Sequence, residues 1–176
     1  MRCFVALWPD HEARERLAEA AAALAREIPS ARPTRADNLH LTLAFIGELR
    51  PALAAVVVQR LAALPRPWAP STPWRLDRIG SFPSARVAWA GGEHDERLER
   101  LASDARSILD DLHVHYDRKP FAAHVTLARH VGRLEARGLE PPVRWPIGQP
   151  RLVVSARDDA GRTAYRNWRH PGDRVD

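Results

Sequence analysis

Cysteine is almost absent from this chain, because Cys3 is the single cysteine among 176 residues. One cysteine cannot form an internal disulfide, which argues against a small secreted scaffold held together by such bonds. Cys3 lies within an apolar run, so we expect it to be buried as a small hydrophobic side chain. No hydrophobic run approaches the length of a membrane span, and no charged segment leads into an apolar one. We therefore expect no secretory leader, no membrane partner and a cytoplasmic location.

The usual nucleic-acid-binding motifs are missing as well. There is no zinc-finger spacing, no aromatic-rich RNA-recognition strand and no glycine-rich phosphate loop. The net charge is +5 and the isoelectric point is near 10.5, a balance that favours polyanionic partners without determining a fold. Hydrophobic residues make up 45% of the chain, so we expect a packed core in one domain that covers residues 1–176.

A short motif that occurs twice is the main positive signal. His40-Leu41-Thr42-Leu43-Ala44 returns 84 positions later as His124-Val125-Thr126-Leu127-Ala128, with four of the five residues identical. In a strand, alternation places the histidine and the threonine on one face and the intervening aliphatic residues on the other. Each copy therefore places an imidazole beside a hydroxyl on one face, while the aliphatic residues on the other face pack into the hydrophobic core.

The repeat extends to the segments around the motif. Arg2 and the apolar run 3–8 correspond, at the same spacing of 84, to Arg86 and the run 87–90. A segment with helical periodicity follows each run. We interpret this pattern as an internal duplication that gives two lobes related by a pseudo-two-fold axis.

Periodicity and turn residues divide the chain into alternating elements. We expect helices over 11–28, 51–64 and 93–112, and strands over 2–8, 39–46, 73–82, 85–90, 121–129, 151–157 and 163–168. The proline-containing segments 29–38, 65–72 and 130–149 are expected to be loops, with 65–72 the most linker-like. Strands in hairpin-like neighbours indicate an α+β fold with antiparallel sheets.

Two histidines that face one another could cleave a phosphodiester without a metal. One imidazole would take a proton from the attacking water and the other would give a proton to the departing oxygen, since a pKa of about 6.5 makes both states accessible. Thr42 and Thr126 would donate hydrogen bonds to the non-bridging oxygens. The symmetry leaves open whether His40 or His124 is the acid.

Other residues have competing interpretations. His113 and His115 lie near Asp110 and Asp111, but no second cluster completes a metal site, so a solvated helix end is the simpler explanation. Arg129 could bind phosphate, or it could be a surface arginine. Strict alternation would place Arg129 on the face opposite His124, so phosphate binding would need a strand end or a bulge.

Alternation from His40 places Phe45 on the opposite face of the strand. We therefore expect Phe45 to be a core residue.

The sequence resembles the two-histidine (2H) phosphoesterase superfamily, and within it the RNA 2′,3′-cyclic phosphodiesterases, also called 2′-5′ RNA ligases. The resemblance covers nearly the whole chain and rests on residues 2–7, 38–48, 81–83, 86–87, 120–121 and 124–129 with Ser155, Tyr165 and Trp168. Two departures concern Ala123, where the family usually has proline, and residues 34–37, where it usually has an aromatic residue. Both leave the nucleobase contacts open.

The resemblance implies a bilobal α+β fold in which two antiparallel sheets line a central cleft with helices outside. It implies no metal and no cofactor. The implied reaction opens a terminal 2′,3′-cyclic phosphate on RNA to a 2′-phosphate, with His40 as proton donor and His124 as proton acceptor. Ligation of a 5′-hydroxyl end would be the reverse reaction.

Two alternatives to this activity differ in substrate or in turnover. The chain could act on a small cyclic nucleotide in place of RNA ends, or it could bind RNA ends without turnover. Two complete motifs argue against the second alternative, because binding alone does not need two titratable imidazoles. We expect a monomer whose partners are RNA ends with a 2′,3′-cyclic phosphate or small nucleotides.

Overall fold

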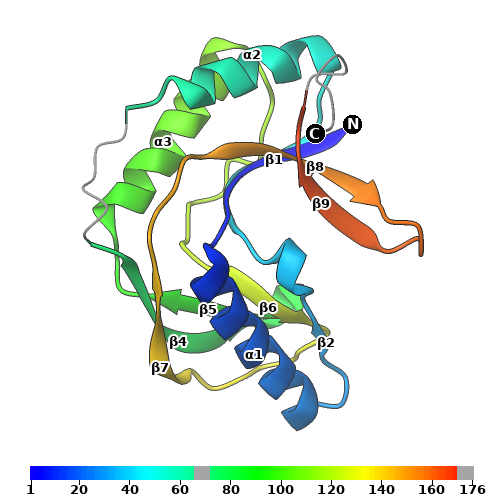
Figure 1. Ribbon diagram of the computed structural model, residues 1–176, viewed down its shortest axis with the longest axis vertical. Helices are drawn as coiled ribbons and strands as arrows, with labels where there is room; N and C mark the ends of the chain where they lie inside the picture. Colours follow the sequence, from blue (N-terminus) through cyan, green and yellow to red (C-terminus); the bar gives the residue numbers. More distant parts are fainter. Residues whose placement is uncertain (66–71, 170–176) are drawn as a thin grey trace.

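The computed structural model describes residues 1–65 and 72–169, so positions 66–71 of the expected linker lie outside the described residues. The elements in chain order are β1 (Arg2–Leu7), α1 (His11–Glu27), β2 (Arg32–Pro33), η1 (Ala36–Asn38), β3 (Leu41–Glu48), α2 (Pro51–Ala62), β4 (Trp74–Phe82), η2 (Pro83–Ala85), β5 (Val87–Gly92), α3 (Glu96–Asp111), β6 (Val125–Arg129), β7 (Arg137–Trp145), β8 (Arg151–Arg157) and β9 (Thr163–Asn167) (Figure 1). The expected helices and most expected strands are confirmed within a few residues.

The strands form one antiparallel sheet rather than the two sheets that the family resemblance implies. Its order is β7-β4-β5-β6-β3-β1-β8-β9, and β2 pairs with β6. The halves of this sheet meet between β3 and β6, where Leu41 lies opposite Val125. The α+β class is confirmed, and the junction between the halves falls beside the two histidines.

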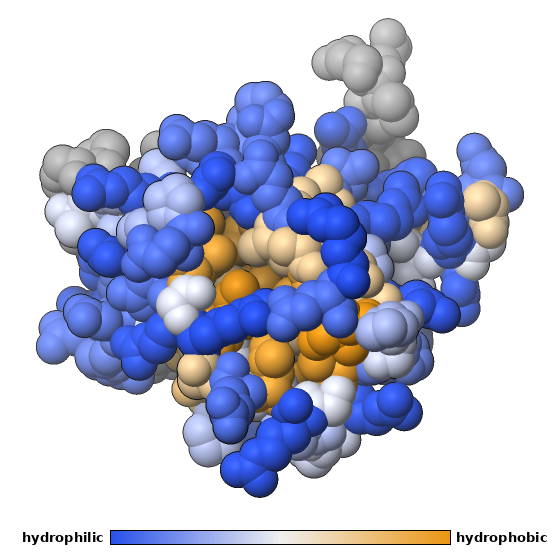
Figure 2. Space-filling model, turned by 90° about the horizontal axis from the view of Figure 1, so that it is seen from below, coloured by the Kyte–Doolittle hydropathy of each residue, from blue (hydrophilic) through white to orange (hydrophobic). Residues whose placement is uncertain are grey.

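The helices exchange sides between the two halves. Helix α1 follows β1 in sequence but packs against β6 and β7, whereas α3 follows β5 and packs against β3. Figure 1 shows α1 at one end of the molecule, near β2 and β6, and α2 with α3 at the other. Each motif strand is therefore supported by the helix of the other half, and a single hydrophobic cluster runs through both. In the face shown in Figure 2, hydrophobic residues are gathered at the centre and hydrophilic residues surround them.

Aspartates begin the two longer helices. The Asp10 carboxylate accepts a hydrogen bond from the Ala13 backbone N–H at 2.9 Å, and Asp95 accepts from Arg97 N–H at 3.0 Å. Such caps satisfy N–H groups that have no partner within the helix. The expected boundary between the strand ending at 90 and the helix beginning at 93 is shifted, because Gly91 and Gly92 remain in β5 and α3 begins only after Asp95.

Strand β7 is a strand where the sequence predicts a loop. Pro141 and Pro142 suggested irregular structure, yet both lie within β7, which pairs with β4 alone at one end of the sheet. Leu76 of β4 pairs with Val143 of β7, and Arg78 pairs with Gly138. The prolines lie between these two pairs, where the pairing of the strands is irregular. Proline has no N–H to donate and is tolerated at edges and bulges.

A bulge occurs at the same place in both motif strands. Val5 and Ala6 of β1 pair with Ala44 and Thr42, which leaves Leu43 as an extra residue of β3. In β6 the extra residue is Leu127, because Ala88 and Trp89 of β5 pair with Ala128 and Thr126.

These pairings correct the single repeat spacing expected from the sequence. The motif strands correspond at 84 residues, as the sequence indicates, but β1 and β5 correspond at one residue less. An extra residue in each motif strand also changes which side chains share its face, since alternation restarts after a bulge.

Candidate active site

Each histidine lies immediately before its motif strand and makes the same hydrogen bond. His40 Nδ1 lies 2.6 Å from the Asn38 carbonyl oxygen, and His124 Nδ1 lies 2.7 Å from the Ala122 carbonyl oxygen. A carbonyl can only accept, so Nδ1 carries the hydrogen in both rings. Both Nε2 atoms are then left to exchange protons with a substrate.

The strand register sets each histidine beside the threonine of the other motif. The Leu41–Val125 pair places His40 across from Thr126, and Thr42 across from His124. Two pockets agree with this register. A cavity of about 360 Å³ is lined by His40 and Thr126, and one of about 310 Å³ is lined by Thr42 and His124. The structure therefore brings the four predicted residues together as two crossed pairs.

Aromatic rings surround His40. Its ring centroid lies 4.8 Å from Phe4, 5.1 Å from Tyr165 and 5.9 Å from Trp8. The pKa of His40 is lowered to about 4, chiefly by burial and to a smaller extent by His124 and Arg129, while the hydrogen bond to the Asn38 carbonyl acts in the opposite direction.

His124 has a simpler environment. The Phe82 ring meets it edge-on with centroids 5.0 Å apart, and burial lowers the pKa of His124. Because both pKa values are lowered, the protein disfavours the protonated form of each imidazole. An anion placed between them would favour protonation of one ring, because an opposite charge nearby stabilises the charged form.

The bulges bring Arg129 and Phe45 to the face of the cleft. Arg129 lines the pocket of His40 and Thr126, as the bulge at Leu127 permits. Phe45 lines the pocket of His124 and is 39% exposed, so the expectation that it belongs to the core is wrong. The physical reason is the extra residue at Leu43, which shifts the alternation of β3.

Arg129 and Phe45 occupy equivalent positions in the two motif strands, so the two pockets differ in character. The His40 pocket is lined by three arginines, Arg32, Arg35 and Arg129. The His124 pocket is lined by three phenylalanines and three charged residues: Phe45, Phe82 and Phe121 with Arg106, Asp117 and Lys119.

Several residues of the site carry no periodic signal in the sequence. Arg32 and Arg35 come from a segment expected to be a loop, and they reach the site because β2 pairs with β6. Tyr165 comes from the remote strand β9. Asn38, Phe82, Phe121 and Tyr165 belong to the segments that carry the family resemblance, which was the one available signal for them.

The acidic residues near His113 and His115 have structural partners. Asp110 accepts hydrogen bonds from Tyr116 and Arg118, and Asp111 accepts from Arg60. Within residues 1–65 and 72–169 no group of three histidine, cysteine, aspartate or glutamate side chains is placed to hold a metal ion. No helix in the same ranges has the length and apolarity that a membrane span requires.

Paired His-x-Thr motifs on adjoining antiparallel strands of an α+β protein define the class of two-histidine phosphoesterases, and comparisons with known proteins agree. A family profile described as LigT like Phosphoesterase matches residues 7–89. The RNA 2′,3′-cyclic phosphodiesterase of Escherichia coli K12 is 36% identical over 137 residues, which cover 76% of this chain and 75% of that protein. The Thermus thermophilus protein of the same name is 32% identical over 171 residues, or 88% of this chain and 82% of that one. The chain therefore belongs to the LigT-like phosphoesterase family.

Solved structures support the same assignment. The crystal structure of Escherichia coli LigT complexed with 3′-AMP has a TM-score of 0.80 and 27% identity, and the match covers 96% of this chain and 95% of that one. The structure of TT0787 of Thermus thermophilus has a TM-score of 0.70 with 31% identity and 96% coverage of both chains.

A longer relative from Geobacillus stearothermophilus is 28% identical over 129 residues, and the chain covers 41% of its length.

Proposed function

We propose that this protein is an RNA 2′,3′-cyclic phosphodiesterase, a hydrolase that opens a terminal 2′,3′-cyclic phosphate to a 2′-phosphate by acid–base catalysis without a metal. One observation carries the proposal: two imidazoles with the same Nδ1 hydrogen bond adjoin the strand junction, each beside the other motif's threonine. Curated relatives with up to 36% identity over most of the chain carry this activity in their names.

The reaction needs two proton transfers on opposite sides of phosphorus. Neutral His124 accepts a proton from water at Nε2 as the water oxygen bonds to phosphorus. The bond from phosphorus to the 3′ oxygen breaks, and protonated His40 gives that oxygen its proton. Thr42, Thr126 and Arg129 bind the non-bridging oxygens, whose negative charge grows in the transition state. The choice of His40 as acid follows the family resemblance.

In this mechanism, the substrate has to raise the low pKa of His40. His40 is neutral at pH 7 without substrate, because burial lowers its pKa to about 4. It becomes an acid only when the phosphodiester anion raises this pKa. NMR titration of the ring with and without inorganic phosphate tests the requirement. A His40 pKa that phosphate leaves unchanged would favour the opposite assignment of the two histidines.

The two pockets suggest where the substrate lies. The ribose carries the leaving 3′ oxygen and therefore lies on the His40 side, where Arg32 and Arg129 can bind RNA phosphates, whereas Arg35 is paired with Asp158. Water enters on the side of His124. In the reverse reaction the aromatic pocket there could accept the nucleoside of an RNA 5′-hydroxyl end, whose base would stack on phenyl rings.

Product analysis tests this function. An RNA oligonucleotide with a 2′,3′-cyclic phosphate is expected to yield a 2′-phosphate in the presence of EDTA. His40→Ala and His124→Ala are each expected to lower the rate roughly 10²- to 10⁴-fold. Full activity in either variant, or a 3′-phosphate product, would contradict the mechanism.

The choice of substrate needs a second comparison. The arginines of the His40 pocket favour an oligonucleotide over a mononucleotide, because they can bind phosphates upstream of the cyclic one. Equal kcat/KM for a cyclic-phosphate oligonucleotide and for 2′,3′-cyclic AMP would favour a small nucleotide as the natural substrate. Binding of either without product would support the binding module that lacks turnover.

We further propose that the enzyme is a cytoplasmic monomer in which the two halves form one domain of duplicated origin. The exchange of α1 and α3 between the halves supports the single domain, and the buried, unpaired thiol of Cys3 suits a reducing compartment. Light scattering tests the monomer, and cell fractionation tests the location.

A further inference from the structure

We infer that Asn38 is a positioning residue for His40, and that it acts from a fixed place on the β8–β9 hairpin. The carbonyl oxygen of Asn38 accepts the hydrogen bond from His40 Nδ1 at 2.6 Å. The side chain of the same residue makes two further bonds, both to strand β9. Asn38 therefore joins the imidazole to a segment more than 120 residues away in the sequence.

The two side-chain bonds resemble a pairing between strands. Asn38 Nδ2 donates to the Thr163 carbonyl oxygen at 2.9 Å, and the Tyr165 backbone N–H donates to Asn38 Oδ1 at 3.0 Å. Strand β9 is the last strand of the sheet order and pairs with β8 on its other side. The amide of Asn38 thus satisfies two backbone groups on an edge that would otherwise need water. Both bonds restrain the rotation of the Asn38 side chain and the position of its backbone.

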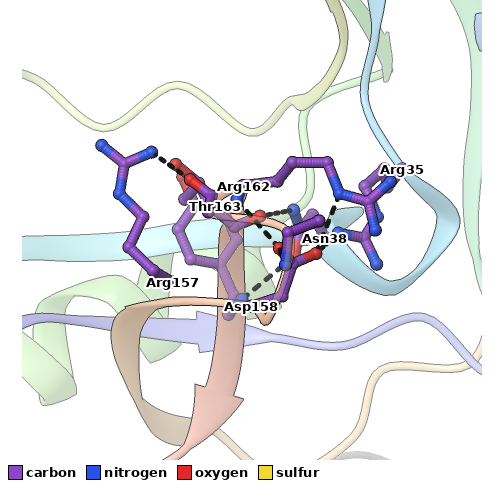
Figure 3. Close-up of polar contacts among 9 residues, drawn as sticks. Arg35, Asn38, Arg157, Asp158, Arg162 and Thr163 are labelled. Carbon is purple, nitrogen blue, oxygen red and sulfur yellow. Dashed lines mark hydrogen bonds and ion pairs between the residues drawn. The ribbon is translucent and has the colours of Figure 1, made fainter.

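The tip of the same hairpin binds Arg35, which precedes Asn38 in the chain. Asp158 accepts a bond from Arg35 Nη1 at 2.6 Å and another from Arg162 Nε at 3.0 Å. The backbone N–H of Arg162 also donates to Asp158, at 2.8 Å. These bonds hold the pKa of Asp158 at about 2, so the carboxylate stays charged across the working range of pH. Figure 3 shows Arg35, Asn38, Asp158, Arg162 and Thr163 gathered at this tip.

The other histidine has no such support. The carbonyl that orients His124 belongs to Ala122, whose methyl group cannot form a hydrogen bond. Asn38 and Ala122 occupy the same position relative to the two motifs. The two imidazoles therefore share one geometry but differ in what fixes it, and Asn38 is needed on one side only.

The chemical consequence concerns the hydrogen on the ring of His40. The Nδ1 bond keeps the hydrogen on Nδ1 and leaves Nε2 free to take up a proton and pass it on. If the Asn38 carbonyl moves away, neutral His40 can place its hydrogen on Nε2 and its ring can rotate. For histidines that bind metals, the loss of such supporting contacts typically lowers activity roughly 10- to 100-fold. We expect a loss of similar size here.

Asn38→Ala tests this role, with Gln149→Ala as the matched control. Gln149 also has a side-chain amide that joins two distant segments, because its Nε2 donates to the Leu61 carbonyl oxygen at 2.7 Å, and it lines neither the His40 pocket nor the His124 pocket. We expect Asn38→Ala to lower kcat roughly 10- to 100-fold with a smaller change in KM. Nitrogen NMR of the rings should show hydrogen on Nε2 of His40 and leave His124 unchanged. Gln149→Ala should keep wild-type kcat and tautomers.

The conservative variant covers the case in which Asn38→Ala does not fold. Asn38→Asp keeps an acceptor for Tyr165 N–H and loses the donor to Thr163, so a smaller loss of kcat with a partial tautomer change is expected. Unchanged kcat and an unchanged His40 tautomer in the folded variant would overturn the inference, as would lower kcat with an unchanged tautomer. Only the kcat readout rests on the proposed function. If the wild type cleaves no cyclic phosphate but the variants still change the tautomer, the proposed function fails and the inference stands.

Discussion

Leu41 of β3 lies directly opposite Val125 of β6, and this pair joins the two halves of the sheet. Both side chains are fully buried, so the residues before and after them face the other way. On that face each histidine adjoins the threonine of the other motif. A junction of two aliphatic residues thus determines how four polar residues are shared between two pockets.

The crossed pairing predicts which histidine each threonine affects. Thr42→Val should shift the NMR titration of His124 more than that of His40, and Thr126→Val should do the reverse, because each hydroxyl lies across from the other motif's ring. Each variant should lose roughly 10- to 100-fold in kcat/KM, because its hydroxyl donates to a negatively charged phosphate oxygen. Perturbation confined to the histidine of the same motif would contradict the register.

The partly buried imidazole of His40 predicts a pH dependence of stability. The pKa of His40 is lowered from 6.5 to about 4, so the unfolded chain binds a proton between these values that the folded chain does not. The free energy of unfolding should therefore fall as the pH drops from 7 to 4, by an amount on the order of 3 kcal/mol from this residue. Urea unfolding at several pH values should show a shallower fall in His40→Gln. Equal slopes for the two proteins would mean that folding does not lower the pKa of His40.

Arg129 should matter for the substrate more than an arginine elsewhere. It lines the His40 pocket beside Thr126, so Arg129→Gln should lower kcat/KM about 10- to 100-fold, the usual range for a charged hydrogen bond. Arg100, exposed on α3 outside that pocket, is the matched control, and Arg100→Gln should keep wild-type kinetics. Similar losses of kcat/KM in both variants would mean that Arg129 contributes only through the overall positive charge of the protein.

Cys3 should be inert in the folded protein. Its side chain is fully buried, and burial raises the pKa of the thiol to about 11. A thiol with such a pKa has roughly 100-fold less thiolate at pH 8 than an ordinary one. Labelling with a disulfide reagent should be slow in buffer and rapid in denaturant. Fast labelling of the native protein would show that β1 opens locally.

The sequence predicted the motif strands and the helices because their signals are local. Alternation along His40 to Ala44 and helical spacing over 11–28 depend on neighbours within a few residues. The same rule misplaced Phe45, because a bulge at Leu43 inserts a residue that no periodicity reveals. It also missed β7, whose prolines are compatible with a strand only at an edge.

The sequence by itself determined that two copies of one imidazole–hydroxyl strand occur in a basic α+β protein, since residue type and spacing are written in the chain. Only the tertiary structure decided which threonine serves which histidine, which side of the cleft holds Arg129, and that Asn38 reaches β9 to hold His40. The physical reason is that these relations depend on pairing between segments far apart in the sequence. Strand register and bulges set that pairing, and a shift of one residue turns a side chain to the other face.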